Sequence, residues 1–522
     1  MKKFLLPVSI ALGLLFDLLF WEKSPGVSFP LFVLLSLAAG WLLLKLEGNT
    51  PHKVNYWLLV PILFFSAMTV FRREPMTVFL GFLFTLFSVL LLPVSWLNGL
   101  WPVFNLADYA VNFVDLLGGM LSLPWREKKA AGDTETGKRK KSLAPILRGL
   151  ALSLPVWLVF IALLSSADLI FAQRLDVLLK NFNLGNMSEL LMQAILIALI
   201  AFFFAGGVLF AARRSARIKL AGAEKPWFAP FLGMTEAAIL LGGVILLFSV
   251  FVGMQFRYFF SGQANIALDG FTYADYARRG FGELVGVAFL SVLLQQAISL
   301  ITRRETVKDR RAFTALSLGI IALVLVILVS AFQRLALYET AYGFTRMRTY
   351  PHVFMIWLGV LLVAVAVMEV LGRRRWFFNA AILTAMGFGA TLGIMNVDRL
   401  IVQRNLRNAA AGMPLDVGYL ASLSSDAIPV LVENLVGEAL PESVREGVGA
   451  ALVCYRDVYG GSDLQQVQPW PSYHFSVARA QQALQAVNAR LEDYRVNTET
   501  WPALVTAPSG RVYSCQSVTG MD

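Results

Sequence analysis

The sequence predicts an all-α fold: a polytopic helical membrane protein with about 11 transmembrane helices and a small C-terminal all-helical domain outside the cytoplasm. Of the 522 residues, 57% are hydrophobic and only 15% are charged, whereas soluble domains have about 45–50% apolar and about 25% charged residues. Apolar runs of the length that a helix needs to cross a hydrocarbon layer about 30 Å thick recur along the chain and stop near residue 395. This composition excludes an ordinary water-soluble enzyme.

Eleven runs are long and apolar enough to span a bilayer. They are continuous rather than alternating, which favours helices over a membrane β-barrel. The first follows Lys2 and Lys3 as in a signal peptide, but no small-residue cleavage site follows it, so we expect a retained span. The predicted spans are 4–21, 27–46, 54–71, 76–97, 146–167, 189–212, 232–254, 281–301, 313–333, 352–372 and 376–395.

The orientation of these spans follows from the distribution of Lys and Arg, which concentrate on the cytoplasmic side. With the N-terminus inside, the inner connections carry 25 of these residues and the outer connections 11, and the remaining 9 follow residue 396. We therefore predict a cytoplasmic N-terminus, and eleven spans then place the C-terminus outside.

The two cysteines of the chain, Cys454 and Cys515, both lie in the segment that the charge distribution places outside. A cysteine pair confined to one domain in an oxidising compartment predicts a disulfide, worth about 4 kcal/mol in the chain-entropy model. Two unrelated buried thiols are the alternative.

The composition divides the chain into four parts. Residues 1–97 hold the first four spans, 98–145 form a cytoplasmic connection, 146–395 hold the remaining spans, and 396–522 form the external domain. In the connection, Trp101–Leu123 has the pattern of a helix lying in the membrane interface, and Arg126–Lys141 reads as a polar, basic linker.

The external domain is predicted to be helical. It has no Lys, and its 9 Arg face 13 Asp and Glu. Ser425 or Asp426 is expected to cap a helix ahead of Pro429. The predicted helices are Leu400–Ala411, Leu415–Leu423, Asp426–Leu435, Glu442–Tyr455 and Ser472–Leu491.

Ionisable residues inside spans are candidates for function because lipid makes them costly. Asp17 is the deepest, and Glu236 and Glu283 lie near the ends of their spans, as does Glu369. A buried pair or a proton-linked role is the functional interpretation, and structural anchoring is the alternative.

The outer connections favour Arg over Lys, and Arg offers a planar fork that suits carboxylate or phosphate groups. The candidates for an anion-binding outer face are Arg257, Arg278, Arg279, Arg346 and Arg348. Internal pairing of these Arg residues with carboxylates is the alternative.

Other binding chemistry has little support in the sequence. The three histidines lie far apart on different connections, so no metal site is expected, and no cofactor is expected either. The expected partners are the lipid bilayer and an anionic lipid, a glycan or an envelope protein, with no nucleic acid.

Several long motifs resemble one family of bacterial proteins. They are FDLLFWEKSPGVSFPLF near the N-terminus, FTYADYARRGFGELV (271–285), YETAYGFTRMRTY (338–350), NVDRLIVQRNLRN (396–408) and LDVGYLASLSSDAIPVLV (415–432). Together they resemble the polytopic membrane proteins grouped as domain of unknown function 4173. The resemblance implies a bacterial inner-membrane protein and brings no established activity. These motifs fall in or beside the predicted outer connections, which points to the outer face as the working surface.

Three hypotheses for the function remain open. The first is a non-enzymatic sensor or scaffold of the cell envelope, whose outer face binds an anion or a partner. The second is a secondary transporter, which predicts an ionisable site near the membrane midplane. The third is a transferase with a lipid-linked donor, which requires outer carboxylates, with Asp17, Glu22, Asp275 and Glu283 as candidates, beside phosphate-holding Arg residues.

Overall fold

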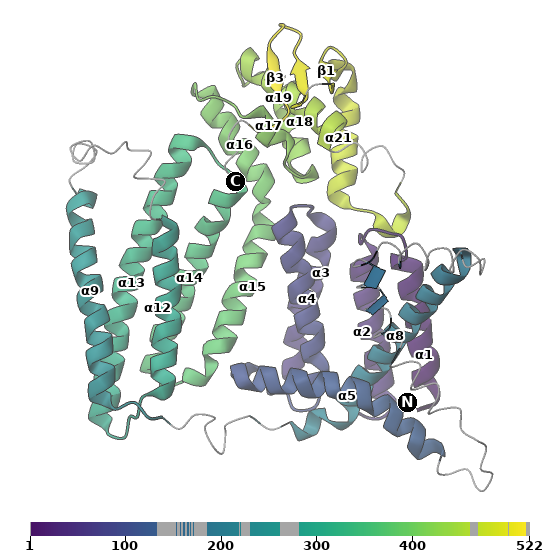
Figure 1. Cartoon of the computed structure of the whole chain (residues 1–522), viewed down its shortest axis with the longest axis vertical. Helices are drawn as coiled ribbons and strands as arrows, with labels where there is room; N and C mark the ends of the chain where they lie inside the picture. The colour runs from purple at the N-terminus through teal and green to yellow at the C-terminus, as the bar shows by residue number, and fades with distance from the viewer. Residues whose placement is uncertain are drawn as a thin grey trace. The chain divides into compact units, whose positions relative to one another are not determined.

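The computed structural model describes residues 2–132, 185–218, 220, 230–260, 281–459, 468–499 and 501–517, together with single residues between 153 and 171. This part of the chain is almost entirely helical, and eleven of its helices are long and apolar enough to cross a membrane (Figure 1). The predicted fold class, a polytopic all-α membrane protein with a small C-terminal helical region, is confirmed.

The chain forms two compact units. The first comprises residues 1–23, 32–50 and 114–216. It contains α1 (Lys2–Phe20), α8 (Gly185–Arg213), most of α2 (Ser28–Lys45) and the later turns of α5 (Leu106–Gly132). Helices α1 and α8 pack closely, since a Cβ atom on Gly13 would lie 2.4 Å from the carbonyl oxygen of Ile197.

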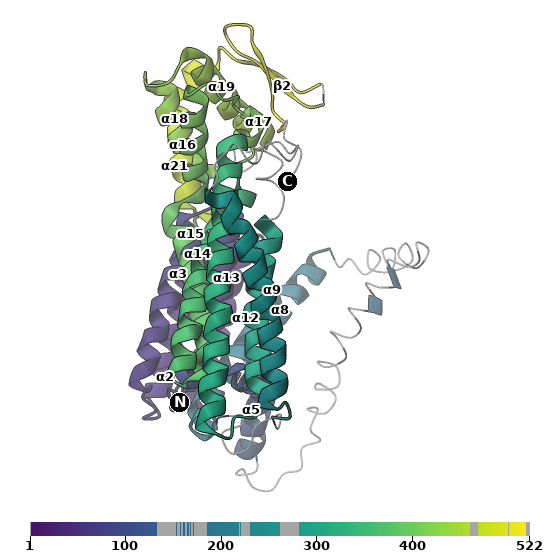
Figure 2. The same ribbon diagram turned by 90° about the vertical axis from the view of Figure 1, so that its left-hand side faces the viewer.

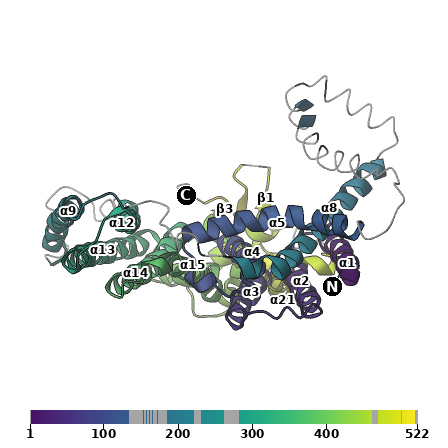
Figure 3. The same cartoon turned by 90° about the horizontal axis from the view of Figure 1, so that it is seen from below.

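The second unit comprises residues 24–31, 51–113 and 217–522, and it contains a row of membrane-length helices. Seen from below, α13 packs against α9, α12 and α14, and α14 is followed by α15, α4 and α3 in that order (Figure 3). Their bounds are α3 (Leu59–Phe71), which the 3₁₀ helix η1 (Lys53–Leu58) precedes, α4 (Pro75–Ser95), α9 (Met234–Phe260), α12 (Phe281–Ile301), α13 (Val307–Tyr342), α14 (Arg346–Val370) and α15 (Phe377–Met395).

Ten of the eleven membrane-length helices correspond to predicted spans, and nine of these agree with the prediction to within about six residues at each end, the exception being α13. At 36 residues this helix is about 54 Å long, so it extends well beyond the predicted span 313–333. The predicted span 146–167 lies outside the described residues, apart from a few single positions. The eleventh membrane-length helix is α5, whose window is the least apolar of the set.

Helix α5 corrects the prediction for the connection between residues 98 and 145. The helix begins at Leu106 and continues to Gly132, so the segment from Arg126 onward, expected to be a polar linker, starts as helix. Its first turns lie across the lower ends of α4 and α15 in Figure 1, as an interfacial helix would. They are held there by Asp108, which binds Arg375, and by Tyr109, which binds Asn379.

The C-terminal domain, residues 396–517, lies beyond one end of the row (Figure 2). Its five predicted helices are confirmed with small shifts of their ends. The cap ahead of Pro429 is Ser424, whose hydroxyl accepts the Asp426 N–H, rather than Ser425 or Asp426. The elements are α16 (Val397–Ala410), α17 (Val417–Ala421), η6 (Ser425–Ala427), α18 (Ile428–Val436), α19 (Glu442–Cys454), the 3₁₀ turn η8 (Trp470–Ser472) and α21 (Phe475–Leu491).

A small antiparallel sheet completes this domain, so the expectation of an all-helical domain is wrong in this detail. Its strands are β1 (Arg495–Asn497), β2 (Leu504–Thr506) and β3 (Val512–Ser514), in the order β1-β2-β3. The predicted disulfide joins Cys454, the last residue of α19, to Cys515 just after β3. The sheet is thereby tied to the helical core, where both cysteines are buried.

The hydrophobic core is continuous from the row of helices into the C-terminal domain. Phe65, Phe84 and Leu392 of the row belong to the same buried cluster as Ile401 and Leu431 of the domain. A second cluster lies among α9, α12, α13 and α14. The domain therefore packs directly on the ends of α3, α4, α14 and α15, which we call the domain-side end of the bundle; the opposite end is the far end.

Candidate functional site

The domain-side end holds three buried carboxylates, on Glu74, Asp398 and Asp426. Glu74 belongs to the α3–α4 connection, whereas Asp398 and Asp426 belong to α16 and η6 of the C-terminal domain. A buried carboxylate is tolerated only when its oxygens are hydrogen-bonded or paired with a cation. We call the set formed by these three residues with Arg346 and Ser424 the junction.

Asp398 is the centre of the junction and has no exposed surface. Arg346 binds it at two points, with Nε 2.8 Å from Oδ1 and Nη2 2.5 Å from Oδ2. Ser424 adds two donors to Oδ2, its backbone N–H at 2.9 Å and its hydroxyl at 2.6 Å. A planar guanidinium is the group that matches a carboxylate in this paired geometry. The ion pair therefore ties the start of α14 to the start of α16.

Asp426 and Glu74 lock the α3–α4 connection to the domain. The Asp426 carboxylate accepts the backbone N–H groups of Arg73 at 2.7 Å and of Glu74 at 3.0 Å. Burial raises the pKa of Asp426, an effect that the hydrogen bond from the Arg73 backbone opposes. Glu74 caps α4 by accepting the N–H groups of Met76 and Thr77, each at 2.8 Å, and it also accepts the Tyr350 hydroxyl.

Asn405 and His474 also join the bundle to the C-terminal domain. The Asn405 side chain of α16 accepts the N–H of Phe344 at 2.7 Å and donates to its carbonyl at 2.8 Å, which fixes the α13–α14 connection. The two ring nitrogens of His474, just before α21, lie 3.2 Å from the Val70 carbonyl and 3.1 Å from that of Pro25. Every connection at this end that the structure describes is thus tied to the domain by polar contacts.

The far end carries a separate ionic cluster. The Glu369 carboxylate is buried and binds Arg304 at 3.2 Å and Arg374 at 3.0 Å. The Arg304 guanidinium lies 3.3 Å from the centre of the Phe313 ring, over which it stacks. Glu369 therefore joins α14 to the α12–α13 and α14–α15 connections. This is the structural anchoring that the sequence analysis gave as the alternative to a functional role.

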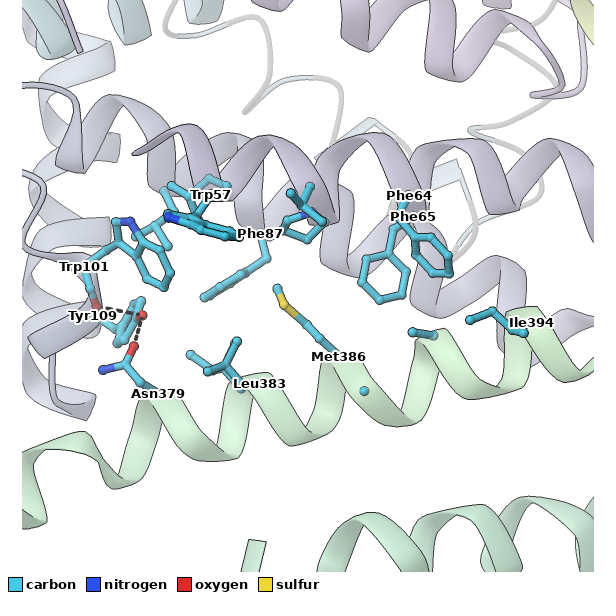
Figure 4. A pocket seen from close by; sticks show the side chains of 17 residues that line it. Trp57, Phe64, Phe65, Phe87, Trp101, Tyr109, Asn379, Leu383, Met386 and Ile394 are labelled. Carbon is cyan, nitrogen blue, oxygen red and sulfur yellow. Dashed lines mark hydrogen bonds between the residues drawn. The ribbon is translucent and has the colours of Figure 1, made fainter. Parts of the chain in front are cut away.

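An apolar groove lies between η1, α3 and α4 on one side and α15 on the other. Its volume is about 520 Å³, and 17 residues line it (Figure 4). The lining is apolar except at one end, where Tyr109 and Asn379 meet beside Trp101 (Figure 4). There the Tyr109 hydroxyl donates to Asn379 Oδ1 at 2.7 Å, and Asn379 Nδ2 donates to the Phe104 carbonyl at 2.7 Å. The polar groups of Tyr109 and Asn379 are therefore bonded to each other and to the backbone, whereas the buried indole N–H of Trp101 has no hydrogen-bond partner among the described residues.

The three intramembrane candidates are not brought together. Asp17 belongs to the first unit, is partly buried, and its Oδ1 atom is buried with no hydrogen bond in the described part of the chain. Glu236 is exposed and accepts the Gly233 N–H at 2.7 Å, so it caps the start of α9. Glu283 is exposed in the first turn of α12, where a negative charge favours the helix dipole.

Two of the five candidate anion-binding Arg residues have internal partners. Arg346 binds Asp398, as described, and Arg348 donates from Nη1 to the carbonyls of Tyr342 at 3.0 Å and Gly343 at 2.7 Å. Arg278 and Arg279 lie outside the described residues, as does Asp275, and the side chain of Arg257 is not described. The Arg346 guanidinium is thus paired with a carboxylate of the protein itself, which was the alternative to an anion-binding role.

Sequence reasoning did not single out Asp398, Glu74 or the groove. A partial signal existed for the first, because Asp398 and Arg346 both lie in motifs that carry the family resemblance. Within the described residues, no group of three or more His, Cys, Asp and Glu could hold a metal ion.

The comparisons with known proteins place the chain in a family. The model of a family described as Domain of unknown function (DUF4153) matches residues 59–434, which is more than half of the chain. No curated protein and no solved structure matches the sequence. The number 4173, given by the resemblance of the motifs, is not confirmed, whereas membership of a family of unknown function is. The chain belongs to the family described as Domain of unknown function (DUF4153).

Proposed function

We propose that this protein is a non-enzymatic scaffold of the bacterial cell envelope, whose membrane bundle holds the C-terminal domain in one fixed orientation on the extracytoplasmic side of the inner membrane. The observation that carries the proposal is the junction, where the buried carboxylates of Asp398 and Asp426, both in the domain, bind Arg346 and the backbone of the α3–α4 connection in the bundle. If the domain moved relative to the bundle, Asp398 and Asp426 would lose these partners, and removing the partners of a buried carboxylate is costly. The domain and the bundle therefore act as one body.

The aromatic residues at the two ends support a membrane between them. At the domain-side end, Phe71 of α3 stacks on Phe475 of α21 at 4.8 Å between ring centres, and Tyr473 packs against Phe475 at 5.3 Å. At the far end, Trp57 and Trp101 lie at the start of α3 and just before α5. Trp and Tyr residues concentrate at both membrane–water interfaces, so Tyr473 at one end and Trp57 and Trp101 at the other suit a bundle that crosses one bilayer.

A protein partner suits the outer face better than an anionic lipid or glycan. Trp501, between β1 and β2, is 84% exposed, and exposed Trp residues are frequent anchors of protein interfaces. By contrast, the guanidinium groups of Arg346 and Arg348 already have carboxylate or carbonyl partners. An outer-face transferase also needs free Arg residues beside carboxylates, so the engagement of Arg346 makes that alternative weaker.

In vivo cross-linking tests the proposal. A photoreactive amino acid in place of Trp501, illuminated in intact cells, is expected to give a discrete product with one envelope protein. The same group at Arg490, an exposed position of α21, is the control for nonspecific capture. Asp398→Ala, combined with the Trp501 probe, is expected to abolish the product while the disulfide persists. A product that survives Asp398→Ala, or the absence of any discrete product at Trp501, contradicts the proposal.

A secondary transporter is the second candidate, because Asp17, inside a candidate span, carries a buried carboxylate oxygen with no hydrogen bond to any described residue. Such a group is a site at which a proton can bind during transport. If the protein transports protons, proteoliposomes under a pH gradient will show a flux that Asp17→Asn abolishes. Equal flux in protein-containing and empty vesicles rules this candidate out.

A further inference from the structure

The groove between α3, α4 and α15 has the dimensions of a site for a single hydrocarbon chain. Between Asn379 and Ile394, which mark its two ends on α15, the helix rises about 22 Å. A volume of about 520 Å³ over that length gives a mean cross-section of about 24 Å². A space of this length and section suits one extended hydrocarbon chain.

The lining shows what kind of molecule the groove accepts. Its floor is formed by buried side chains such as Leu58, Phe65 and Leu91, whereas rim residues such as Val60 and Leu383 are more than half exposed. The rim belongs to helices of membrane length, so the groove opens sideways into the hydrocarbon layer. The only amide and hydroxyl side-chain groups in the lining, those of Asn379 and Tyr109, bond to each other. The buried indole N–H of Trp101, beside them at one end of the groove, has no hydrogen-bond partner in the described part of the chain, so unmet polar chemistry is confined to that end. An occupant thus gains dispersion contacts with carbon atoms and has no need of polar groups along its length.

One end of the groove suits a charged headgroup. Trp57 and Trp101 lie at that end (Figure 4), and indole rings favour the headgroup level of a bilayer. Lys53 begins η1, four residues before Trp57, which places it about 8 Å further along the 3₁₀ helix. Lys53 is exposed, so its ammonium group is available to a phosphate at the membrane surface.

We propose that this groove binds one acyl chain of an anionic phospholipid, with the phosphate beside Lys53 and the chain between α3 and α15. The hydrocarbon layer of one leaflet is about 15 Å thick, so one chain fits within the length of the groove. A groove left empty in the bilayer would lose the contacts of its whole lining. The lipid fills the gap between α15 and the α3–α4 pair and so stabilises the end of the bundle that α5 crosses. This inference does not depend on the proposed scaffold function.

Photolabelling of the full-length protein tests this site. The protein is reconstituted in phosphatidylglycerol vesicles that contain a small fraction of phosphatidylglycerol with a diazirine on its acyl chain. After illumination, peptides 57–65 and 382–394 are expected to carry several-fold more label than the α9 peptide with Leu246 and Leu247, which are also exposed on a membrane-length helix. Equal labelling of the groove and α9 peptides overturns the site.

Two variants fill the groove from opposite sides, Val60→Phe on α3 and Ala390→Phe on α15. Both are expected to reduce labelling of the groove peptides several-fold. Ala385→Phe is the matched control, because Ala385 is exposed on α15 and does not line the groove, so its labelling should equal that of the wild type. Val60 lies on the exposed rim, so Val60→Phe can fill the groove without disturbing the packing of the helices. This variant therefore still tests the site if Ala390→Phe disturbs that packing.

The same experiment distinguishes other occupants. An equimolar polyprenyl phosphate that removes the label would identify an isoprenoid chain and overturn the phospholipid assignment. Cross-links between two copies of the protein at the groove peptides would identify a dimer interface, with the same consequence. Labelling that both groove-filling variants leave unchanged also contradicts the proposal.

Discussion

Arg346 and Asp398 form a two-point ion pair, with Nε–Oδ1 and Nη2–Oδ2 distances of 2.8 and 2.5 Å, that joins the first turn of α14 to the first turn of α16. Asp398 is fully buried and most of the Arg346 side chain is covered. Because the pair spans the boundary between the bundle and the C-terminal domain, its loss should affect both stability and the orientation of the domain.

Removing the cation of this pair should be costly. Arg346→Gln leaves the Asp398 carboxylate buried without its cation, so we expect the free energy of unfolding to fall by about 3 kcal/mol. The double variant Arg346→Gln, Asp398→Asn should lose less than the sum of the two single changes. Thermal unfolding in detergent measures this loss. Arg399→Gln, at an exposed position of α16 next to Asp398, should change stability by no more than about 0.5 kcal/mol. Equal effects at Arg346 and Arg399 would mean that the pair does not hold the domain.

The buried carboxyl of Asp426 predicts a pH dependence. Its pKa is raised by burial, so the native state binds a proton at Asp426 more tightly than the unfolded chain does. The stability that this group contributes is greatest below the pKa of an unfolded Asp and is lost as the pH rises through the folded pKa. Lowering the pH from 7 toward 4 should therefore stabilise the wild type relative to Asp426→Asn. Parallel stability curves for the two proteins over this range would contradict this assignment.

The disulfide predicts both stability and location. Cys454 and Cys515 are 61 residues apart, and removal of such a link costs about 2–5 kcal/mol. Cys454→Ser should therefore lower the unfolding temperature of the domain, and a reductant should have the same effect on the wild type. In intact cells, an impermeant thiol reagent should label both cysteines only after reduction. Labelling that requires lysed cells would place the domain on the cytoplasmic side.

The far-end cluster offers an independent test of buried charge. Glu369→Ala leaves the guanidinium of Arg304, only 5% exposed, without its carboxylate, so we expect a loss of about 3–5 kcal/mol. Glu305→Ala, at an exposed position nearby in the sequence, is the control and should have little effect. Unfolding in detergent measures both. A small loss at Glu369 would show that water reaches the cluster.

The membrane-length helices could be predicted from the sequence because apolar runs near 20 residues can be recognised from composition alone. The disulfide could be predicted because the only two cysteines of the chain lie in the same domain. The sheet of the C-terminal domain could not, because strands as short as Val512–Ser514 carry too little alternation to be distinguished from a loop. The sequence predicted a helix over Trp101–Leu123, whereas α5 begins at Leu106 and continues to Gly132, because its polar last turns extend the helix into a segment that composition assigns to a linker.

The junction could not be predicted from the sequence, for a different reason. In sequence, Asp398 and Glu74 look like ordinary acidic residues at the starts of helices, where they favour the helix dipole. Their burial arises only when α16 and η6 pack on the ends of α4 and α14, which is a tertiary effect. Arg346 was a candidate because it lies in a predicted outer connection, but the sequence could not show that its partner is Asp398, 52 residues further along the chain. The groove likewise combines residues from η1, α3, α4 and α15 that no local pattern connects.

The central claim, that the C-terminal domain and the bundle form one body, can be measured directly by pulsed electron paramagnetic resonance. Spin labels at Lys308→Cys, exposed at the far end of α13, and Arg490→Cys, exposed on α21, report the distance between the bundle and the domain. We predict one narrow distance distribution in the wild-type background, and a broad one when Asp398→Ala breaks the junction. A broad or multiple distribution in the otherwise unaltered protein would contradict a fixed orientation and the scaffold function built on it.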